Sequence, residues 1–342
     1  MDADLIQMMR RLAPDLTEEM TRRALILERI SALQPVGRRQ LAARLNLPER
    51  EIRNAAALLR ELGYVSLDPS GMNLTPRAGE VLEAAREFSR AMSGLTEMEQ
   101  RLSQALGIDR VMIAPGNADE DGQVLNDVGR VCAGRLRMLL QSGNTLAVTG
   151  GRSIAAVARN LQPQSPLNVM VVPARGGLGR SVELQANTLA EEIAGRLGGH
   201  YRLIHLPDRI NAQTMQEMRK VPEVSEVLEL LERADVILHG IGRAEEAVRN
   251  QKLSREVQNR LMSEHAAGES IGSYYDLEGR CLLASASFGV DPARLKPTCR
   301  MIAVAAGASK AEAVISVTRH SHHAMLATDE GAAARMLSIL KA

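Results

Sequence analysis

RRQLAARLNLPEREIRNAAALLRELG, residues 38–63, decides the fold of the N-terminal part of the chain. Apolar residues recur at helical spacing on both sides of its centre, first as Leu41, Ala42 and Leu45 and then as Ile52, Ala55, Ala56 and Leu59. Asn46-Leu47-Pro48 predicts a tight turn between two helices, with Pro48 at the first position of the second. Gly63 suits the C′ position that ends this helix. The stretch therefore predicts a helix-turn-helix.

The residues on either side complete a winged helix. Upstream, Thr17–Ser31 carries an apolar stripe with Thr17 as its expected N-cap, which predicts a preceding helix. Downstream, two short apolar segments flank the turn formers Asp68-Pro69-Ser70-Gly71, which predicts a small hairpin. We therefore expect residues 1–75 to form a winged-helix DNA-binding domain.

Polar side chains lie where such a domain touches double-stranded operator DNA. In a winged helix, the N-terminal part of the second helix enters the major groove. There, arginine recognises guanine and asparagine recognises adenine, and the start of the preceding helix contacts phosphates. The candidate DNA-binding residues are therefore Arg38, Arg39, Arg50, Arg53 and Asn54. The alternative is that these arginines are solvated or ion-paired, for example Arg53 with Glu49.

Residues 76–107 form one nearly continuous helical pattern, interrupted at Gly94. We expect a linker helix between two domains. It can serve as a dimer seam or as a strut between domains, or it can pack on its own domain. A homo-oligomer, a dimer or tetramer, is favoured because a two-fold operator needs two DNA-binding domains, one for each half-site.

Bulk composition limits the class of protein. The 342 residues are too many for one ordinary domain. The formal net charge is +1, and aromatic residues make up only 2%, with no Trp, which argues against a single-stranded nucleic-acid binder that works by base stacking. Cys132, Cys281 and Cys299 have no paired spacing and suit a reducing compartment. With no apolar run long enough for a signal peptide or a membrane span, we expect a cytoplasmic protein.

Residues 108–342 alternate apolar strands with helices, which predicts a parallel sheet covered on both faces. The expected fold class is therefore α/β, with a winged helix-turn-helix followed by a doubly wound, Rossmann-like domain. The expected strands are 110–114, 145–149, 169–173, 201–206, 235–239, 301–305 and 324–328.

Glycine-rich turns follow several of these strands, and ligands of such sheets bind at the carboxyl ends of the strands. Thr149-Gly150-Gly151-Arg152-Ser153 leads from a strand into a helix, whose N–H groups attract anions. Arg175 directly follows another strand, and Lys310 stands at a helix start, where an anionic partner would explain a cation. The loops match neither the dinucleotide nor the ATP fingerprint. We therefore predict a phosphorylated small ligand, with plain structural turns as the alternative.

Other chemistry is weakly supported by the residues. His320, His322 and His323 are not spaced to focus on one metal ion, so no metal site is expected. Asp329 or Glu330 could act as the base of a sugar-phosphate isomerase or deaminase, but beyond His239 no histidine–carboxylate set stands at the strand ends. We expect no catalytic residue and no cofactor. A regulator that senses NAD or ATP in the same pocket is a third interpretation.

An ordered set of motifs that spans nearly the whole chain resembles the SorC/DeoR-type sugar-responsive transcriptional regulators. These motifs are AVTGGRSI (147–154), VPARGGLG (172–179), QANT (185–188), HGIG (239–242), GSYYD (272–276), AVAAGASKAEAV (303–314) and TDEGAA (328–333). The resemblance implies an effector domain related to sugar-phosphate isomerases and deaminases, of the NagB/RpiA/CoA-transferase type. It also implies a repressor of a glycolytic operon centred on glyceraldehyde-3-phosphate dehydrogenase, relieved by fructose-1,6-bisphosphate.

The same resemblance assigns roles to residues. It implies that one phosphate of the effector lies on Gly150, Gly151, Arg152, Ser153 and Lys310, with Arg175 nearby. Gln185 and Glu269 would meet sugar hydroxyls, and Arg249 would meet a second phosphate. This chain departs from the family at Arg152, where Thr is usual, which either tightens phosphate binding or changes the preferred sugar.

Overall fold

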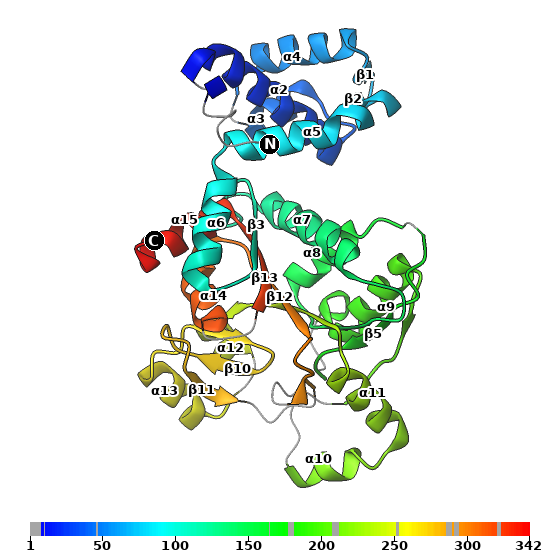
Figure 1. Ribbon diagram of the computed structural model, residues 1–342, viewed down its shortest axis with the longest axis vertical. Coiled ribbons are helices and arrows are strands. Elements are labelled where there is room, and N and C mark those ends of the chain that lie inside the picture. Colours follow the sequence, from blue (N-terminus) through cyan, green and yellow to red (C-terminus); the bar gives the residue numbers. More distant parts are fainter. Residues whose placement is uncertain are drawn as a thin grey trace. The chain divides into compact units, whose positions relative to one another are not determined.

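The computed structural model describes residues 8–9, 11–45, 47–163, 165–176, 181–206, 212–250, 253–284, 289–290, 294–319 and 323–342. The chain forms two compact units, Met1–Thr96 and Glu97–Ala342 (Figure 1).

The N-terminal unit is a winged helix, as predicted. Its core consists of fully buried side chains from each helix and from the hairpin, among them Ile26, Leu41, Ile52 and Met72. The hairpin closes onto the helices through a β-bridge between Val36 and Met72. The elements are α2 (Pro14–Leu33), α3 (Arg38–Leu45), α4 (Glu49–Glu61), β1 (Val65–Asp68), β2 (Gly71–Leu74), η1 (Pro76–Ala78) and α5 (Gly79–Met92).

Two helix starts differ from the sequence prediction. α2 begins at Pro14 and not after Thr17, because proline suits the first turn of a helix. The Thr17 hydroxyl instead donates to the carbonyl of Ala13 (2.8 Å). Pro48 is the N-cap of α4 and not its first helical residue, since its ψ of 136° is extended. Asn46, predicted in the turn, lies outside the described residues.

The segment 76–107, predicted as a linker, forms two helices. Gly94 adopts a φ of +76° between α5 and α6 (Leu95–Leu106), a conformation that glycine tolerates and that ends α5. Phe88 and Met92 of α5 pack with Ala24 of α2. In α6, the Glu99 carboxylate accepts the backbone N–H of Ile113 at 2.7 Å, which joins this helix to the first strand of the α/β unit.

The C-terminal unit contains a seven-stranded parallel sheet in the order β3-β13-β12-β7-β4-β5-β6. Buried apolar residues fill the central strands, as predicted for a sheet covered on both faces. The strands are β3 (Arg110–Ala114), β4 (Thr145–Val148), β5 (Met170–Pro173), β6 (His200–Tyr201), β7 (Val236–Gly240), β12 (Arg300–Val304) and β13 (His323–Asp329).

Helices cover both faces, so the predicted doubly wound fold is confirmed. Leu146 and Val148 of β4 face α7, α8 and α9, whereas Ala147 between them faces α11, because successive strand residues point to opposite sides. The helices that follow α6 are α7 (Gln123–Leu139), α8 (Arg152–Asn160), α9 (Ala186–Leu197), α10 (Ala212–Met218), α11 (Pro222–Glu232), α12 (Ala244–Asn250), α13 (Arg255–Ser263), α14 (Ala311–Thr318) and α15 (Glu330–Leu340).

A second, antiparallel sheet was not predicted. It has the order β11-β10-β9-β8 and lies in the crossover between β7 and β12, together with α12 and α13 (Figure 1). Its strands are β8 (Gly242–Arg243), β9 (Gly268–Ser270), β10 (Ser273–Tyr275) and β11 (Cys281–Ala284). β9 packs directly on α14, since a Cβ at Gly268 would lie 2.6 Å from the Ala313 carbonyl oxygen. The insertion therefore stands at the carboxyl ends of the parallel strands.

One predicted strand is much shorter than expected. Residues 201–206 were expected to form a strand, but β6 comprises only His200 and Tyr201, at the edge of the sheet. Both residues are exposed, so the apolar run that continues to Leu206 packs elsewhere, with Ile204 buried against α11.

Candidate effector site and DNA-binding surface

The strand order reverses between β4 and β7, which is where an open α/β sheet is expected to have its ligand crevice. From β4 the chain moves outward to β5 and β6, and then returns to β7 on the other side of β4. Ligands of open α/β sheets bind at such a reversal, at the carboxyl ends of the strands. The loops that leave these two strands are Thr149–Gly151 and Ile241. The Gly240 N–H donates to the Thr149 hydroxyl oxygen at 3.1 Å and joins them.

The start of α8 follows β4 at this reversal. No side chain caps α8, so the backbone N–H groups of its first turn have no partner within the helix. Gly151 precedes the helix with a φ of +110°, which favours glycine. Its neighbour Gly150 lies so close to the next loop that a Cβ there would be 2.5 Å from the Leu184 carbonyl oxygen. This is the geometry of an anion-binding helix N-terminus.

Two cations gather at this helix start. The Lys310 ammonium donates to the carbonyl of Ile241 at 3.1 Å, directly after β7. Burial, together with the positive charge of Arg152, lowers the pKa of Lys310. Arg152 itself is exposed, and among the described residues it has no ion-pair partner. Of the predicted phosphate residues, Gly150, Gly151, Arg152, Ser153 and Lys310 are therefore brought together.

A second helix start, at η4 (Ala308–Lys310), is already occupied by the protein's own side chains. Gly307 donates its N–H to the Asp329 carboxylate at 2.9 Å, and Ser309 donates its N–H to Asp119 at 2.7 Å. The Ala308 N–H donates to the Asn117 side-chain oxygen at 3.2 Å. The anionic partner expected at this helix start is thus supplied by the protein. Lys310 contributes to the crevice through its side chain alone.

Arg175 and Glu269 contact each other. Arg175 extends from the end of β5, Glu269 lies on β9, and their side chains form an ion pair at 3.1 Å with both about 13–14% exposed. The same Glu269 oxygen accepts the N–H of Gly272 at 2.9 Å. The pair links the parallel sheet to the inserted sheet. A ligand that uses both groups must therefore compete with this ion pair.

The last two predicted effector residues lie differently. Gln185 is the N-cap residue of α9 and follows Leu184, whose carbonyl accepts the Gly151 N–H at 2.9 Å, so it stands beside the α8 start. Arg249 lies on α12 with its side chain 62% exposed and forms an ion pair with Glu245 at 2.7 Å. Arg249 therefore takes part in a surface ion pair in this structure.

The carboxylates considered as catalytic bases have structural partners. Asp329 is fully buried and caps α15, and it also accepts the Ala118 N–H at 2.6 Å. Glu330 accepts the N–H of Gly116 at 3.0 Å.

Two buried histidines, one on β7 and one on β13, contact each other. His239 contacts the Ser270 hydroxyl through Nδ1 (2.7 Å) and His323 through Nε2 (2.9 Å). The Ser270 hydroxyl donates to the Gly240 carbonyl, so it accepts from His239. Burial lowers the pKa of both imidazoles, that of His323 to about 4. His320 and His322 lie outside the described residues, and no cluster of three metal-ligating side chains occurs among those described.

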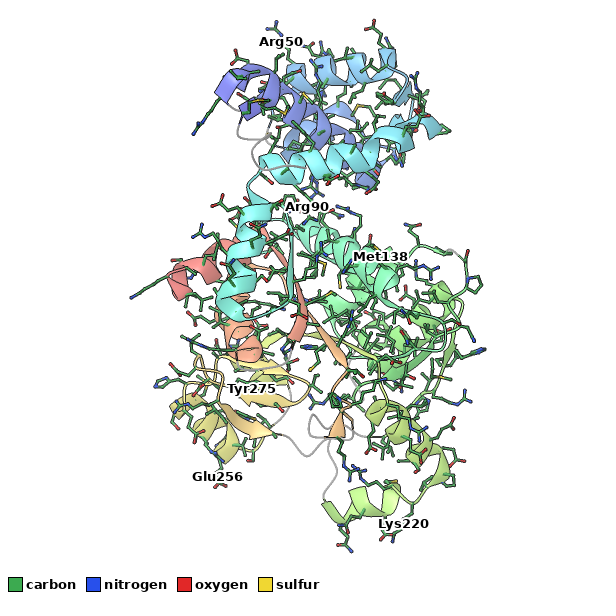
Figure 2. The ribbon with its side chains drawn as sticks, in the orientation of Figure 1. Arg50, Arg90, Met138, Lys220, Glu256 and Tyr275 are labelled. Atoms are coloured by element: carbon green, nitrogen blue, oxygen red, sulfur yellow. The ribbon has the colours of Figure 1, made fainter. Side chains whose placement is uncertain are left out.

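The predicted DNA-binding residues form an exposed surface on the N-terminal unit. Arg50 projects outward from the first turn of α4 (Figure 2), and Asn54 is exposed on the same helix. Arg39 and Arg53 lie 3.4 and 3.6 Å from the Glu49 carboxylate, with side chains 91% and 60% exposed. Such exposed ion pairs contribute less than about 1 kcal/mol to stability. The phosphates of DNA can therefore replace the glutamate as the partner of these arginines. Arg38 is exposed at the start of α3.

The hairpin contributes no positive charge to this surface. No Lys or Arg occurs between Gly63 and Pro76. Asp68 accepts the N–H groups of Ser70 and Gly71 and so rigidifies the hairpin tip. Charge for DNA binding is therefore concentrated on the helices. Across the described residues, none of the helices has the length and apolar character needed to cross a membrane.

Comparison with known proteins agrees with this combination of a winged helix and a sugar-binding α/β unit. Residues 20–88 match the family described as "CggR N-terminal DNA binding domain", and residues 90–338 match the one described as "Putative sugar-binding domain". The chain belongs to the SorC family of sugar-binding transcriptional regulators. It is a DNA-binding regulator and not an enzyme.

Named relatives extend over the whole chain. It is 35% identical to the central glycolytic genes regulator of Priestia megaterium over 97% of this chain and 98% of the relative. The protein of the same name from Bacillus subtilis is 33% identical, with the same coverage. The crystal structure of the full-length sorbitol operon regulator from Klebsiella pneumoniae, 22% identical, has the same fold, with a TM-score of 0.65 over 89% of this chain and 94% of that one.

Sequence reasoning missed several residues of this site. Asn117 and Asp119 follow β3 in a turn, and the Thr149 hydroxyl and the Ile241 carbonyl, which lie within quoted motifs but were given no role, also contribute polar atoms. The run Gly116-Asn117-Ala118-Asp119 directly after a strand was the available signal, because Asn and Asp often cap backbone N–H groups.

Proposed function

We propose that the protein represses a glycolytic operon and that fructose-1,6-bisphosphate, or a related sugar phosphate, relieves the repression. The relatives named central glycolytic genes regulators support the target genes. The observation that carries the proposal is the cationic helix start, where Lys310 and Arg152 flank the uncapped N-terminus of α8. A neutral sugar would form no ion pair with these two cations, whereas a phosphate dianion would.

One phosphate would accept hydrogen bonds from the first-turn N–H groups of α8 and from Lys310, with Ser153 adding a donor. Glu269 and Gln185 would meet the sugar hydroxyls, and Arg175 would be released from Glu269 to reach a phosphate. Arg249 remains a proposed partner of the second phosphate, on condition that its ion pair with Glu245 opens.

On the DNA side, we propose that a homo-oligomer presents two winged helices to a two-fold operator. Arg50, Arg53 and Asn54 would contact bases in the major groove, and Arg38 and Arg39 would contact phosphates. Effector binding would favour an arrangement of the subunits that holds DNA less well, which requires different affinities of the effector for two arrangements.

The test is fluorescence anisotropy on labelled DNA from upstream of the protein's own gene, titrated with fructose-1,6-bisphosphate. Weakening of the complex at millimolar or lower sugar supports the proposal. If DNA binds and the sugar has no effect, fructose-1,6-bisphosphate is excluded, and Arg152→Thr, which restores the residue usual in the family, becomes the variant to titrate next. If no DNA is bound, the operator assignment is wrong.

A further inference from the structure

The carboxylate of Glu269 lies beside the loop that holds Lys310. The Lys310 ammonium donates to the Ile241 carbonyl at 3.1 Å, and a Cβ added at the next residue, Gly242, would lie 3.7 Å from the Oε2 atom of Glu269. Gly242 of β8 pairs with Glu269 of β9. The proposed phosphate contact and the proposed hydroxyl contact of the effector therefore border the same two-residue segment.

One oxygen of this carboxylate is held by the protein, and the other is left for a ligand. Oε1 accepts from the Arg175 guanidinium at 3.1 Å and from the Gly272 N–H at 2.9 Å. Within the described ranges of the chain, Oε2 accepts no hydrogen bond. Because an ionised carboxylate oxygen is an acceptor, Oε2 is the atom that a sugar hydroxyl would reach.

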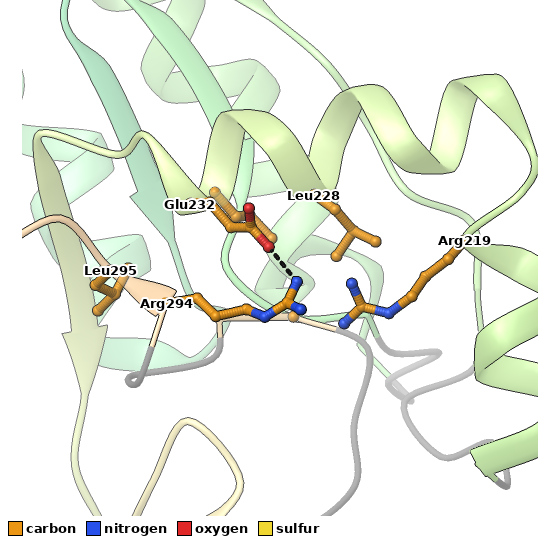
Figure 3. A pocket seen from close by; sticks show the side chains of 7 residues that line it. Arg219, Leu228, Glu232, Arg294 and Leu295 are labelled. Atoms are coloured by element: carbon orange, nitrogen blue, oxygen red, sulfur yellow. Dashed lines mark hydrogen bonds and ion pairs between the residues drawn. The ribbon is translucent and has the colours of Figure 1, made fainter.

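An arginine–glutamate pair is not by itself a ligand site. At the end of α11, Arg294 and Glu232 pair at 2.6 Å with side chains 54% and 39% exposed (Figure 3). The pair of Arg175 and Glu269 has the same chemistry, but its side chains are only 13% and 14% exposed. What distinguishes Glu269 is therefore the way in which the fold holds it.

Strand pairing alone would hold Glu269 weakly. β9 has three residues and β8 has two, and a slip of one residue would turn Glu269 to the opposite face of its strand. The turn from β9 to β10 passes through Ile271 and Gly272, whose φ angles are +49° and +82°. A β-branched residue rarely adopts a positive φ, so the surrounding contacts must hold this hairpin in place.

The buried His239 on β7 holds the end of β9. The Ser270 hydroxyl donates to the Gly240 carbonyl at 2.9 Å, so its oxygen accepts the Nδ1–H of His239 at 2.7 Å. Nε2 of the neutral imidazole then carries no proton and accepts from Nε2 of His323 at 2.9 Å. Because both ring nitrogens have partners, the imidazole has one orientation, and it fixes that of Ser270.

Ser270 and Glu269 are neighbours on a strand, so their side chains point to opposite faces. Since Ser270 points to His239 in the core, Glu269 points away from it. We propose that His239 is a positioning residue of the effector site. By holding Ser270 it keeps Glu269 facing the ligand, and the site thereby selects a phosphate that carries sugar hydroxyls over a phosphate that carries none. This inference rests on the proposed function of the site.

The test is isothermal titration calorimetry of the full-length protein with fructose-1,6-bisphosphate and with pyrophosphate, which has phosphates but no carbon-bound hydroxyl group. We expect Ser270→Ala to weaken binding of the sugar bisphosphate by about tenfold and that of pyrophosphate by less than about twofold, because only the hydrogen bond to Glu269 is affected. His239→Asn keeps an N–H donor for Ser270 and should retain more sugar affinity than His239→Ala. Lys310→Ala, which removes a phosphate contact, should weaken binding of both probes.

A double-mutant cycle distinguishes positioning from a general loosening of the fold. If Ser270 acts through Glu269, Ser270→Ala should weaken sugar binding by less than about twofold in a protein that already carries Glu269→Gln. Glu232→Gln is the matched control for Glu269→Gln, because it alters an exposed arginine pair outside the site, and it should leave both affinities unchanged. Urea denaturation shows whether each variant is folded.

Three outcomes overturn the inference and leave the effector assignment intact. Folded Ser270→Ala protein could bind both probes as the wild type does, it could lose affinity for both probes equally, or it could lose as much sugar affinity with Glu269→Gln as without it. Absence of fructose-1,6-bisphosphate binding by the wild-type protein would instead overturn the proposed effector, and this inference with it.

Discussion

At the scale of single residues, Lys310 decides whether the crevice recognises a phosphate. Its ammonium is held against the Ile241 carbonyl, and its helix start is already capped by Asp119 and Asp329, so its charge is available to a ligand in the crevice. Hydrogen bonds to charged groups contribute about 1.5–3 kcal/mol. We therefore predict that Lys310→Ala weakens binding of the sugar phosphate by about 10- to 100-fold.

DNA binding without effector should be unchanged in the same variant, because Lys310 lies in the α/β unit. Anisotropy titrations of the wild type, Lys310→Ala and Arg175→Ala measure both properties, and Lys341→Ala serves as a control for the loss of a lysine. Normal induction in both Lys310→Ala and Arg175→Ala would show that the phosphate lies elsewhere.

The buried histidines make stability depend on pH. Burial lowers the pKa of His323 from 6.5 to about 4, so between these values the unfolded chain binds more protons than the folded one. The stabilisation is complete above about pH 6.5 and is lost progressively as the pH falls towards 4. For His323 alone, the loss is on the order of 3 kcal/mol.

Urea denaturation between pH 7.5 and pH 4.5 measures this slope. NMR titration of the imidazole protons should show that His323 stays neutral as the pH falls from 6.5 to 4.5. A free energy of unfolding that is level from pH 6.5 to pH 4.5 would contradict the buried, neutral pair.

At the scale of elements, the parallel sheet was predictable and the inserted sheet was not. Continuous apolar runs such as Leu146–Val148 admit few other structures, because both of their faces are buried. The strands β8, β9 and β10 are two or three residues long and half-buried, so they lack a period that a pattern can detect. Their position depends on packing against α14.

The α8 helix start also belongs to this scale, because its shape depends on how two loops meet. We predict that Gly150→Ala destabilises the protein by about 1–3 kcal/mol and abolishes the response to effector, because its Cβ would lie 2.5 Å from the Leu184 carbonyl oxygen. The matched control is Gly195→Ala inside α9, where nothing lies within 4 Å of the new methyl group.

Alanine is the better helix former, so we expect Gly195→Ala to stabilise the protein by about 0.5–1 kcal/mol. Urea midpoints and sugar titrations distinguish the two variants. If Gly150→Ala kept both its stability and its response, the loop would have to move freely, and a rigid anion site there would be wrong.

At the scale of the whole molecule, the sequence predicts which loops meet but not which contacts they make. The carboxyl ends of parallel strands share one edge, so the sequence alone predicts that Lys310 and the start of α8 lie near each other. It does not predict the pairing of Ser309 with Asp119, 190 positions apart, or of Arg175 with Glu269, 94 positions apart. Both depend on the final positions of loops, and sequence spacing carries no information about those positions.

The two units have separate cores, and this leads to a prediction for the whole chain. Among the described residues, two buried clusters of the winged helix lie within residues 24–92, and three of the α/β unit lie within residues 112–327. Because none of these clusters mixes residues of the two units, a fragment of residues 95–342, which keeps α6, should fold and bind the sugar phosphate with the affinity of the full chain measured without DNA. It should not bind operator DNA.

Addition of operator DNA should then weaken sugar binding to the full chain and leave the fragment unaffected, because the coupling between two ligands is reciprocal. Calorimetric titrations of both proteins with and without DNA measure this difference. Equal sugar affinities of the full chain with and without DNA would show that the two units do not communicate, and the effector would then have to act on something other than operator affinity.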